Sequence, residues 1–226
     1  MIVSSLSWAF VSALAVLAGA QNQSPNREPG TGNRELRPRI VAFGDSLTSG
    51  HGIGASRAYP AILQEKIDAA GLDYEVVNAG ASGDTSSRAL PRLERALDGK
   101  VRILIVELGA NDGLRGIPVD DVRRNLSRVI ETAQARGIQV LLCGMEALPN
   151  PRHGGWRYSI AFHGVFTDLA SRYKVPLVPF ILFNVIGNPS LMQPDGAHPN
   201  ASGARAIADN LWPYLEPLLT PVAQRR

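Results

Sequence analysis

A serine in a Gly-Asp-Ser motif is the first residue in this sequence whose type and position suggest chemistry. The apolar run Ile40–Phe43 ends at Gly44-Asp45-Ser46-Leu47, which would place a serine hydroxyl at the carboxyl end of a strand. In open α/β sheets, ligands bind at that edge. A hydroxyl there can attack an acyl group if a neighbouring base activates it. The motif alone indicates little, because a serine after a strand is more often a helix N-cap.

An aspartate and a histidine near the end of the chain could supply that base. They lie in Asp195-Gly196-Ala197-His198-Pro199-Asn200, just before the last helical pattern. His198 would take the serine proton and later protonate the leaving group. Asp195 would hold the histidine tautomer and stabilise the imidazolium. The other histidines have no such partner pattern and are interpreted as surface or structural residues: His51, His153 and His163.

Two further segments follow predicted strands and offer hydrogen-bond donors. In Asn78-Ala79-Gly80-Ala81-Ser82-Gly83-Asp84-Thr85, the glycine at 80 lets the backbone approach a substrate and exposes an N–H group. In Glu107-Leu108-Gly109-Ala110-Asn111-Asp112-Gly113, the asparagine can direct its amide N–H into the same space. The alternative interpretations are a simple turn glycine at Gly80 and an asparagine that bonds its own loop.

These four blocks, in this order and spacing, resemble those of the SGNH (GDSL-type) hydrolase family. The segment Glu107–Gly116 is especially similar to the bacterial periplasmic branch of thioesterases, lysophospholipases and arylesterases. The resemblance covers about residues 39–219. It implies a catalytic triad of Ser46, Asp195 and His198. It also implies an oxyanion hole built from the backbone N–H groups of Ser46 and Gly80 and the side-chain amide of Asn111, and it implies no metal or organic cofactor.

Apolar runs of strand length alternate with helical patterns from Arg39 onward, which predicts a three-layer, doubly wound α/β fold with a parallel five-stranded sheet of the flavodoxin-like type. The predicted strands are Ile40–Phe43, Tyr74–Asn78, Val101–Glu107, Val140–Cys143 and Pro176–Val178. The predicted helices are Tyr59–Ala70, Thr85–Leu97, Val119–Arg136, Trp156–Tyr173 and Ala201–Leu219.

The first residues are typical of an export signal. Trp8–Ala20 is apolar or small and ends in Ala18-Gly19-Ala20, an A-x-A cleavage pattern. The sequence therefore predicts a signal peptide over residues 1–20, a polar, disordered linker over 21–38 and a hydrolase domain over 39–220. This interpretation predicts that the protein is periplasmic or secreted and is not stably inserted in a membrane after cleavage.

Composition excludes several other classes of function. The formal net charge is only +3 among 226 residues, and the basic residues are scattered, so no nucleic-acid surface is indicated. Cys143 is the only cysteine, which excludes an internal disulfide, and no Cys/His spacing predicts a metal site. We expect a buried, inert Cys143, structural carboxylates at Asp45 and Glu107, and a monomer.

The substrate pocket is predicted from the loops Asp112–Pro118 and Glu146–Tyr158, which follow strands on the same edge and contain glycines that would let them move. The side chains expected to line an acyl groove are Leu114, Ile117, Leu148 and Pro149.

The favoured function is a serine hydrolase of small-molecule esters and thioesters, including short- to medium-chain acyl esters, acyl-CoA and lysophospholipids. A carbohydrate acetylesterase with the same triad and a catalytically silent binding module on the same fold are the alternatives. A nucleotide- or flavin-binding protein is disfavoured, because the loop Gly44–Gly50 lacks a phosphate-cradling glycine pattern.

Overall fold

The computed structural model describes residues 37–219. The predicted signal peptide over residues 1–20 lies outside the described residues, as does all but the end of the predicted linker. Arg37 and Pro38, the last residues of that linker, lead directly into the first strand.

The sheet has five parallel strands, as predicted: β1 (Arg39–Gly44), β2 (Glu75–Gly80), β3 (Val101–Glu107), β4 (Gln139–Cys143) and β5 (Leu177–Val178). Their order is β2-β1-β3-β4-β5. The chain therefore reverses its direction of winding between β1 and β3, and a crevice opens at such a switch point beyond the carboxyl ends of the strands. This topology places the segments after β1 and β3 side by side.

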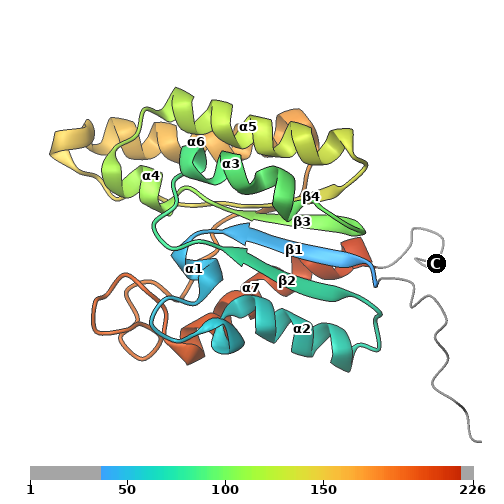
Figure 1. The fold of residues 1–226 in the computed structure, drawn as a ribbon. Helices are drawn as coiled ribbons and strands as arrows, with labels where there is room; N and C mark the ends of the chain where they lie inside the picture. The colour runs from blue at the N-terminus through green and yellow to red at the C-terminus, as the bar shows by residue number, and fades with distance from the viewer. Residues whose placement is uncertain (1–36, 220–226) are drawn as a thin grey trace, which may run out of the picture. The chain divides into compact units, whose positions relative to one another are not determined.

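Helices cover both faces of the sheet (Figure 1). On one face lie α3 (Ser86–Ala96), α5 (Val119–Ala135) and α6 (Gly155–Tyr173), with α5 in contact with both of the others. On the other face α2 (Tyr59–Ala69) packs against α7 (Ala201–Leu219). The three-layer, doubly wound architecture predicted from the sequence is thus confirmed.

Two short α-helices and two 3₁₀ turns were not predicted. They are α1 (Ser46–Ser49), η1 (Ala55–Arg57), α4 (Ala110–Arg115) and η2 (Pro151–His153). The α4 helix corrects the prediction that the chain is a loop from Asp112 onward. Gly116 caps its C-terminus, and the φ of this glycine, 64°, is left-handed. Asn, Asp and Gly, which favour helices weakly, make up half of α4, so no helical pattern was visible.

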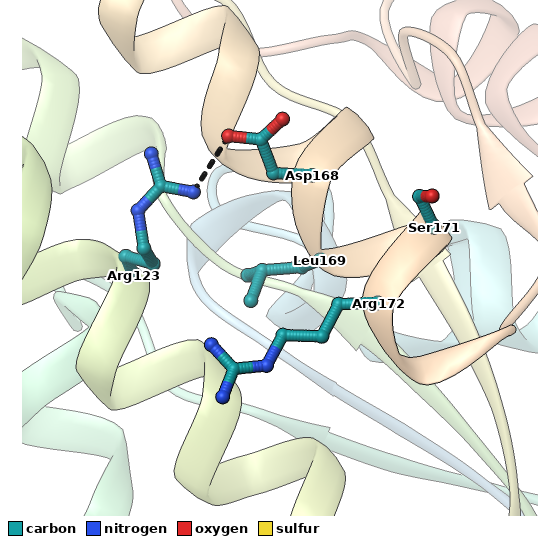
Figure 2. Close-up of a pocket in the computed structure, with 5 residues that line it drawn as sticks. All are labelled: Arg123, Asp168, Leu169, Ser171 and Arg172. Carbon is teal, nitrogen blue, oxygen red and sulfur yellow. Dashed lines mark hydrogen bonds and ion pairs between the residues drawn. The ribbon is translucent and has the colours of Figure 1, made fainter.

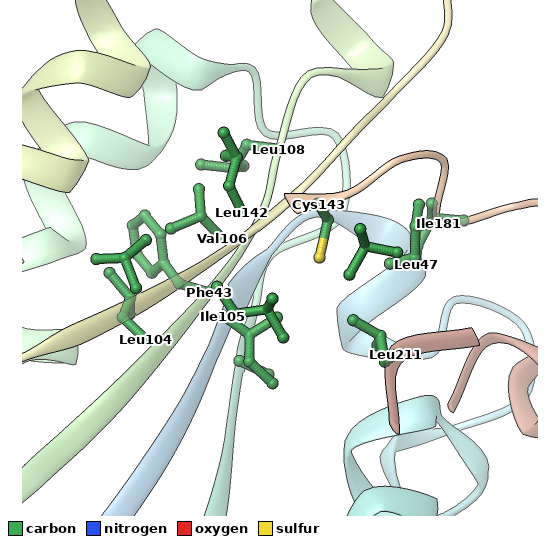
Figure 3. Packing of buried hydrophobic residues seen from close by; sticks show 14 of the residues in the cluster. Phe43, Leu47, Leu104, Ile105, Val106, Leu108, Leu142, Cys143, Ile181 and Leu211 are labelled. Atoms are coloured by element: carbon green, nitrogen blue, oxygen red, sulfur yellow. The ribbon is translucent and has the colours of Figure 1, made fainter. Parts of the chain in front are cut away.

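The core explains why the strands could be recognised. Parallel strands covered on both faces are buried along their length, and the residues of β1 from Ile40 to Phe43 are at most 1% exposed. Figure 3 shows Phe43, Val106 and Leu142 packed together, with Cys143 among other buried side chains. Burial raises the pKa of the Cys143 thiol well above its ordinary value. The prediction of a buried cysteine is therefore confirmed.

Candidate active site

Ser46 is presented by a sharp turn between β1 and α1. Asp45 is the N-cap of α1, and its Oδ1 accepts a hydrogen bond of 3.1 Å from the N–H of Leu47. The residue before Asp45 is Gly44, and a Cβ atom at this position would collide with Thr48 and Glu107. Only glycine lets the chain turn so closely, and the turn leaves Ser46 partly exposed at the first position of the helix.

Ser46, His198 and Asp195 meet at this edge of the sheet. Ser46 Oγ lies 3.1 Å from His198 Nε2, and His198 Nδ1 lies 2.7 Å from Asp195 Oδ2. With Nδ1 protonated and bonded to the carboxylate, Nε2 is free to accept the serine proton. The structure thus brings these three predicted residues into a hydrogen-bonded line, although 152 positions in the sequence separate the serine from the histidine.

Asp195 is held as an acceptor by its own turn. Its Oδ1 accepts hydrogen bonds from the backbone N–H groups of His198 (3.0 Å) and Ala197 (2.9 Å). These bonds and the bond with the His198 ring keep the pKa of Asp195 well below its usual value. The carboxylate is therefore ionised at neutral pH and can orient the imidazole without taking its proton.

Asn111 is fixed beside the serine turn. It lies in the first turn of α4, and its Nδ2 donates to Asp45 Oδ2 at 3.1 Å. The amide carries two hydrogens, so one remains available to a ligand. The next residue, Asp112, is buried and accepts hydrogen bonds from the N–H (2.8 Å) and hydroxyl (2.6 Å) of Ser86. These contacts hold α4, and Asn111 with it, against the start of α3.

Gly80 occupies a different position from the one predicted. It is the last residue of β2 rather than part of the following loop, and its N–H donates to Asn78 Oδ1 at 3.0 Å. A Cβ atom there would collide with the backbone of Ser49. Gly80 thus lets β2 pack tightly against α1, but its N–H is already used, contrary to the prediction of a free oxyanion donor.

The loop after β2 offers another backbone donor in Gly83. Its φ is +82°, a left-handed conformation suited to glycine, and its N–H has no acceptor among the described residues. Its carbonyl accepts a hydrogen bond from Arg115 Nη2 at 3.2 Å, which ties the loop to the helix of Asn111. Arg92 ties the same loop to the serine turn, since its Nη2 donates to Gly44 O (2.6 Å) and its Nε to Asp84 (2.7 Å).

Glu107 lies beneath the serine turn at the end of β3. Its Oε2 accepts a hydrogen bond of 2.6 Å from the Thr48 hydroxyl and one of 3.3 Å from the N–H of Asp45. Thr48 Oγ1 in turn lies 2.8 Å from the Tyr59 hydroxyl. Burial, and then the neighbouring charge of Asp45, raises the pKa of Glu107 well above its ordinary value. Asp45 itself has a pKa raised to about 6 by burial.

Replacing Glu107 should show how far this network supports the serine turn. In Glu107→Leu, the buried Thr48 hydroxyl and Asp45 N–H lose their acceptor. Such a loss costs about 1–3 kcal/mol for each unsatisfied group. We expect a lower free energy of unfolding in urea titrations and a lower kcat. Glu107→Gln, which keeps an acceptor oxygen, is the matched control. Equal stability of the leucine variant and the wild type would show that the network does not support the turn.

His51 is a neighbour of His198 that sequence reasoning missed. Its ring centroid lies 4.5 Å from that of His198, with the planes tilted by 42°. Gln193 joins the two segments, because its Nε2 donates to the carbonyls of His51 (2.7 Å) and Pro199 (2.9 Å). No spacing in the sequence connects His51 with His198, so only the fold reveals this contact.

The residues predicted to line an acyl groove do not form an enclosed wall. Leu114 and Leu148 extend into solvent, with exposed fractions of 71% and 82%. Ile117 is partly buried and packs against the core, while Pro149 is partly buried in the loop after β4. That loop does border α4, since a Cβ atom at Gly113 would lie 3.0 Å from Ala147 Cβ. An acyl chain would therefore lie on an open surface.

A pocket lies between α5 and α6 (Figure 2). Its lining consists of Arg123, Asp168, Leu169, Ser171 and Arg172. Arg123 and Asp168 form a 2.8 Å ion pair across it, so the most prominent charges there already satisfy one another. None of the predicted site residues contributes to this pocket.

Across residues 37–219, no three His, Cys, Asp or Glu side chains are grouped so that they could hold a metal ion. In the same range, no helix is long and apolar enough to cross a membrane.

Comparisons with known proteins agree with this geometry. The model of the GDSL-like lipase/acylhydrolase family matches residues 42–206. Esterase TesA of Pseudomonas aeruginosa is 40% identical over 181 residues, which are 80% of this chain and 89% of that protein. Thioesterase 1/protease 1/lysophospholipase L1 of Escherichia coli K12 is 38% identical, with 80% and 84% covered. The crystal structure of the psychrotrophic esterase EstA from Pseudoalteromonas, inhibited by monoethylphosphonate, has a TM-score of 0.75 at 34% identity, with 80% of this chain and 98% of that chain covered.

Proposed function

Because the chain belongs to the GDSL-like lipase/acylhydrolase family and is a serine ester hydrolase, we propose that Ser46 is its nucleophile, His198 its base and Asp195 the orienting acid. The observation that carries this assignment is the line of hydrogen bonds from Ser46 Oγ through the imidazole to the Asp195 carboxylate. Each atom in this line has a partner at a distance suited to proton transfer.

The reaction then proceeds in two acyl-transfer steps. Nε2 of His198 takes the Ser46 proton as Oγ attacks the acyl carbon, and a tetrahedral oxyanion forms. The imidazolium gives its proton to the leaving alcohol or thiol as the bond to it breaks, leaving an acyl ester on Ser46. A water molecule, deprotonated by His198, attacks this ester. The acid leaves when the proton returns to Ser46 Oγ.

The oxyanion would be bound by three donors around Ser46. One is the N–H of Ser46 itself, which begins α1 and has no acceptor within residues 37–219. The second is the free hydrogen of the Asn111 amide. For the third, the N–H of Gly83 is a better candidate than that of Gly80, because the latter is already bonded to Asn78. Fixed donors of this kind are often the largest contribution to catalysis.

The Asn111 donor gives a direct prediction. Asn111→Ala should lower kcat by ~10²–10³, the usual effect of removing one oxyanion donor. KM should change little, because the donor acts mainly on the transition state. Steady-state kinetics on a soluble ester measure both constants. Asn78→Ala, which removes a nearby amide bonded to Thr48 O, is the control for local disruption. An Asn111 variant with unchanged kcat would remove the residue from the oxyanion hole.

The substrates proposed are acyl esters of short to medium chain, acyl-CoA and lysophospholipids. Support comes from the relatives named thioesterase, lysophospholipase and arylesterase and from the open apolar surface beside Asn111. Purified protein should be tested on an arylester, an acyl-CoA and a lysophospholipid, with Ser46→Ala in parallel. If the folded wild-type protein hydrolyses none of these three substrates, the proposed substrate range is contradicted.

The chain-length prediction concerns Leu114. If acyl chains lie over this side chain, Leu114→Asp should lower kcat/KM for long-chain esters about tenfold, since a lost apolar contact of 1–2 kcal/mol corresponds to roughly that factor. Short-chain esters should be hydrolysed at close to the wild-type rate. The side chain is exposed, so folding should be unaffected. An equal loss on both classes of ester would contradict the groove assignment.

We also propose the domain organisation expected from the sequence. Residues 1–20 would direct export to the periplasm or outside the cell and be removed, residues 21–38 would form a linker, and residues 39–220 would be the catalytic domain, acting as a monomer. The A-x-A pattern at Ala18-Gly19-Ala20 supports the cleavage site.

A further inference from the structure

Three large apolar side chains lie exposed at one end of the fold. Leu148 is 82% exposed, Trp156 72% and Ile160 70%. The segment before α6, which leads into Trp156, projects at the end of the sheet to which the strand arrows point (Figure 1). Apolar groups gathered on a surface in this way mark sites of interaction with proteins or membranes.

The three side chains share one surface, which we call the Trp156 face. Trp156 and Ile160 are four residues apart in α6 and therefore lie one above the other. One turn further, His163 Nδ1 lies 2.6 Å from Glu146 Oε1, so the segment after β4 runs along this side of α6. Glu146 and Leu148 are both exposed and flank the buried Ala147, which places Leu148 on the same outer side.

The Trp156 face is not the core face of α6. That helix buries Phe162, Val165, Phe166 and Leu169 against the rest of the molecule. An amphipathic helix that has already buried one apolar face normally presents polar groups on the other. Here Trp156 and Ile160 occupy the solvent side instead, so packing within the described chain does not account for them.

Charge around the Trp156 face is positive. Arg152 and Arg157 are exposed, and neither forms an ion pair within residues 37–219. The nearest acid on the segment after β4, Glu146, is bonded to His163. Arginines bind phosphate groups well, and tryptophan is suited to the boundary between headgroups and acyl chains. A second copy of the chain fits less well, because a two-fold contact would bring the same arginines of both copies together.

The face also adjoins the catalytic edge. Tyr158, between Trp156 and Ile160, donates its hydroxyl to Ile117 O at 2.8 Å, just after the helix that carries Asn111. We propose that the Trp156 face docks the enzyme on an anionic lipid–water interface, with its apolar side chains among the acyl chains and Arg152 and Arg157 on the phosphates. This rests on the proposed function and specifies it, since it makes lipids held in that interface the preferred esters.

Vesicle flotation tests this with residues 21–226, the form that removal of the export segment would leave. Wild-type protein should float with phosphatidylglycerol vesicles and much less with phosphatidylcholine vesicles, and added salt should weaken the association. The double variant Trp156→Ser/Ile160→Ser should lose at least tenfold in vesicle affinity. Arg152→Gln/Arg157→Gln should lose the preference for anionic vesicles. Phe183→Ser, which removes another exposed apolar side chain, is the matched control and should bind like the wild type.

Hydrolysis of a soluble short-chain ester separates this proposal from the proposed function. All these variants should retain wild-type rates on that ester, which also shows that they fold. Lack of vesicle binding by the wild type, or equal binding by the Trp156/Ile160 variant, would overturn the docking proposal while leaving ester hydrolysis intact. If the wild-type protein is a dimer and the Trp156/Ile160 variant is a monomer, the face binds a second copy of the chain, and the docking proposal is also overturned. Vesicle binding without any ester hydrolysis would contradict the proposed function alone.

Discussion

Replacing Ser46 with alanine should lower kcat for ester hydrolysis by about 10⁴-fold or more, because no other group can form the acyl-enzyme. The effect should be on kcat far more than on KM, since the substitution leaves the donors and the apolar surface in place. Rates on a soluble ester and a thermal unfolding curve measure activity and folding separately.

Ser49→Ala is the matched control for this result. Ser49 lies in the same short helix and is partly buried, and its hydroxyl bonds to the Ser82 hydroxyl (2.8 Å) and to the backbone carbonyl of Ser46 (3.3 Å) but to no side chain of the proposed triad. We expect its kcat to stay within a few-fold of the wild type. A Ser46 variant that retained most of its activity would show that hydrolysis does not proceed through this serine.

Asp195→Asn should lower kcat by roughly 10³–10⁴, the range expected when the orienting acid of a triad is replaced by its amide. The amide oxygen can still accept from the backbone of Ala197 and His198, so the turn should remain folded. An amide N–H facing His198 Nδ1 instead favours the tautomer with its proton on Nε2, which cannot accept the proton of Ser46.

The pH dependence of the wild type supplies a second test of Asp195. Its folded pKa lies below its ordinary value, so the carboxylate is ionised above that value and loses its charge only in strong acid. A fall in kcat/KM between neutral and mildly acidic pH should therefore reflect other groups, and the Asn variant should still show a fall at its lower rate, with the midpoint at lower pH because the neighbouring negative charge is gone. Disappearance of this fall in the Asn variant would show that Asp195 itself titrates there.

Much of the fold could be predicted because its central strands are buried on both faces. Ile40–Phe43 is a continuous apolar run, and Val101–Glu107 contains one from 103 to 106; these two segments became β1 and β3 nearly unchanged. The α4 helix was missed because it is short and rich in residues that favour turns. Its formation depends on tertiary contacts, among them the bonds of Ser86 to Asp112, which no local pattern encodes.

The candidate site was predictable where chemistry depends on residue type and spacing. Ser46, Asp195 and His198 were singled out from short motifs, and the fold brings them within hydrogen-bond distance. Gly80 was predicted as an oxyanion donor, but its N–H is bonded to Asn78 Oδ1. A sequence does not show which N–H groups already have an acceptor. The contacts of Glu107 with Thr48 and of His51 with His198 join separate segments and are visible only in three dimensions.

The measurement that tests the central claim most directly is labelling of the protein with a fluorophosphonate probe, followed by mass spectrometry of the modified peptide. Such probes react with an activated serine, so we expect one label, on Ser46, that is absent from Ser46→Ala and retained in Ser49→Ala. No label on folded protein, or a label on another serine, would contradict the assignment of Ser46 as the nucleophile.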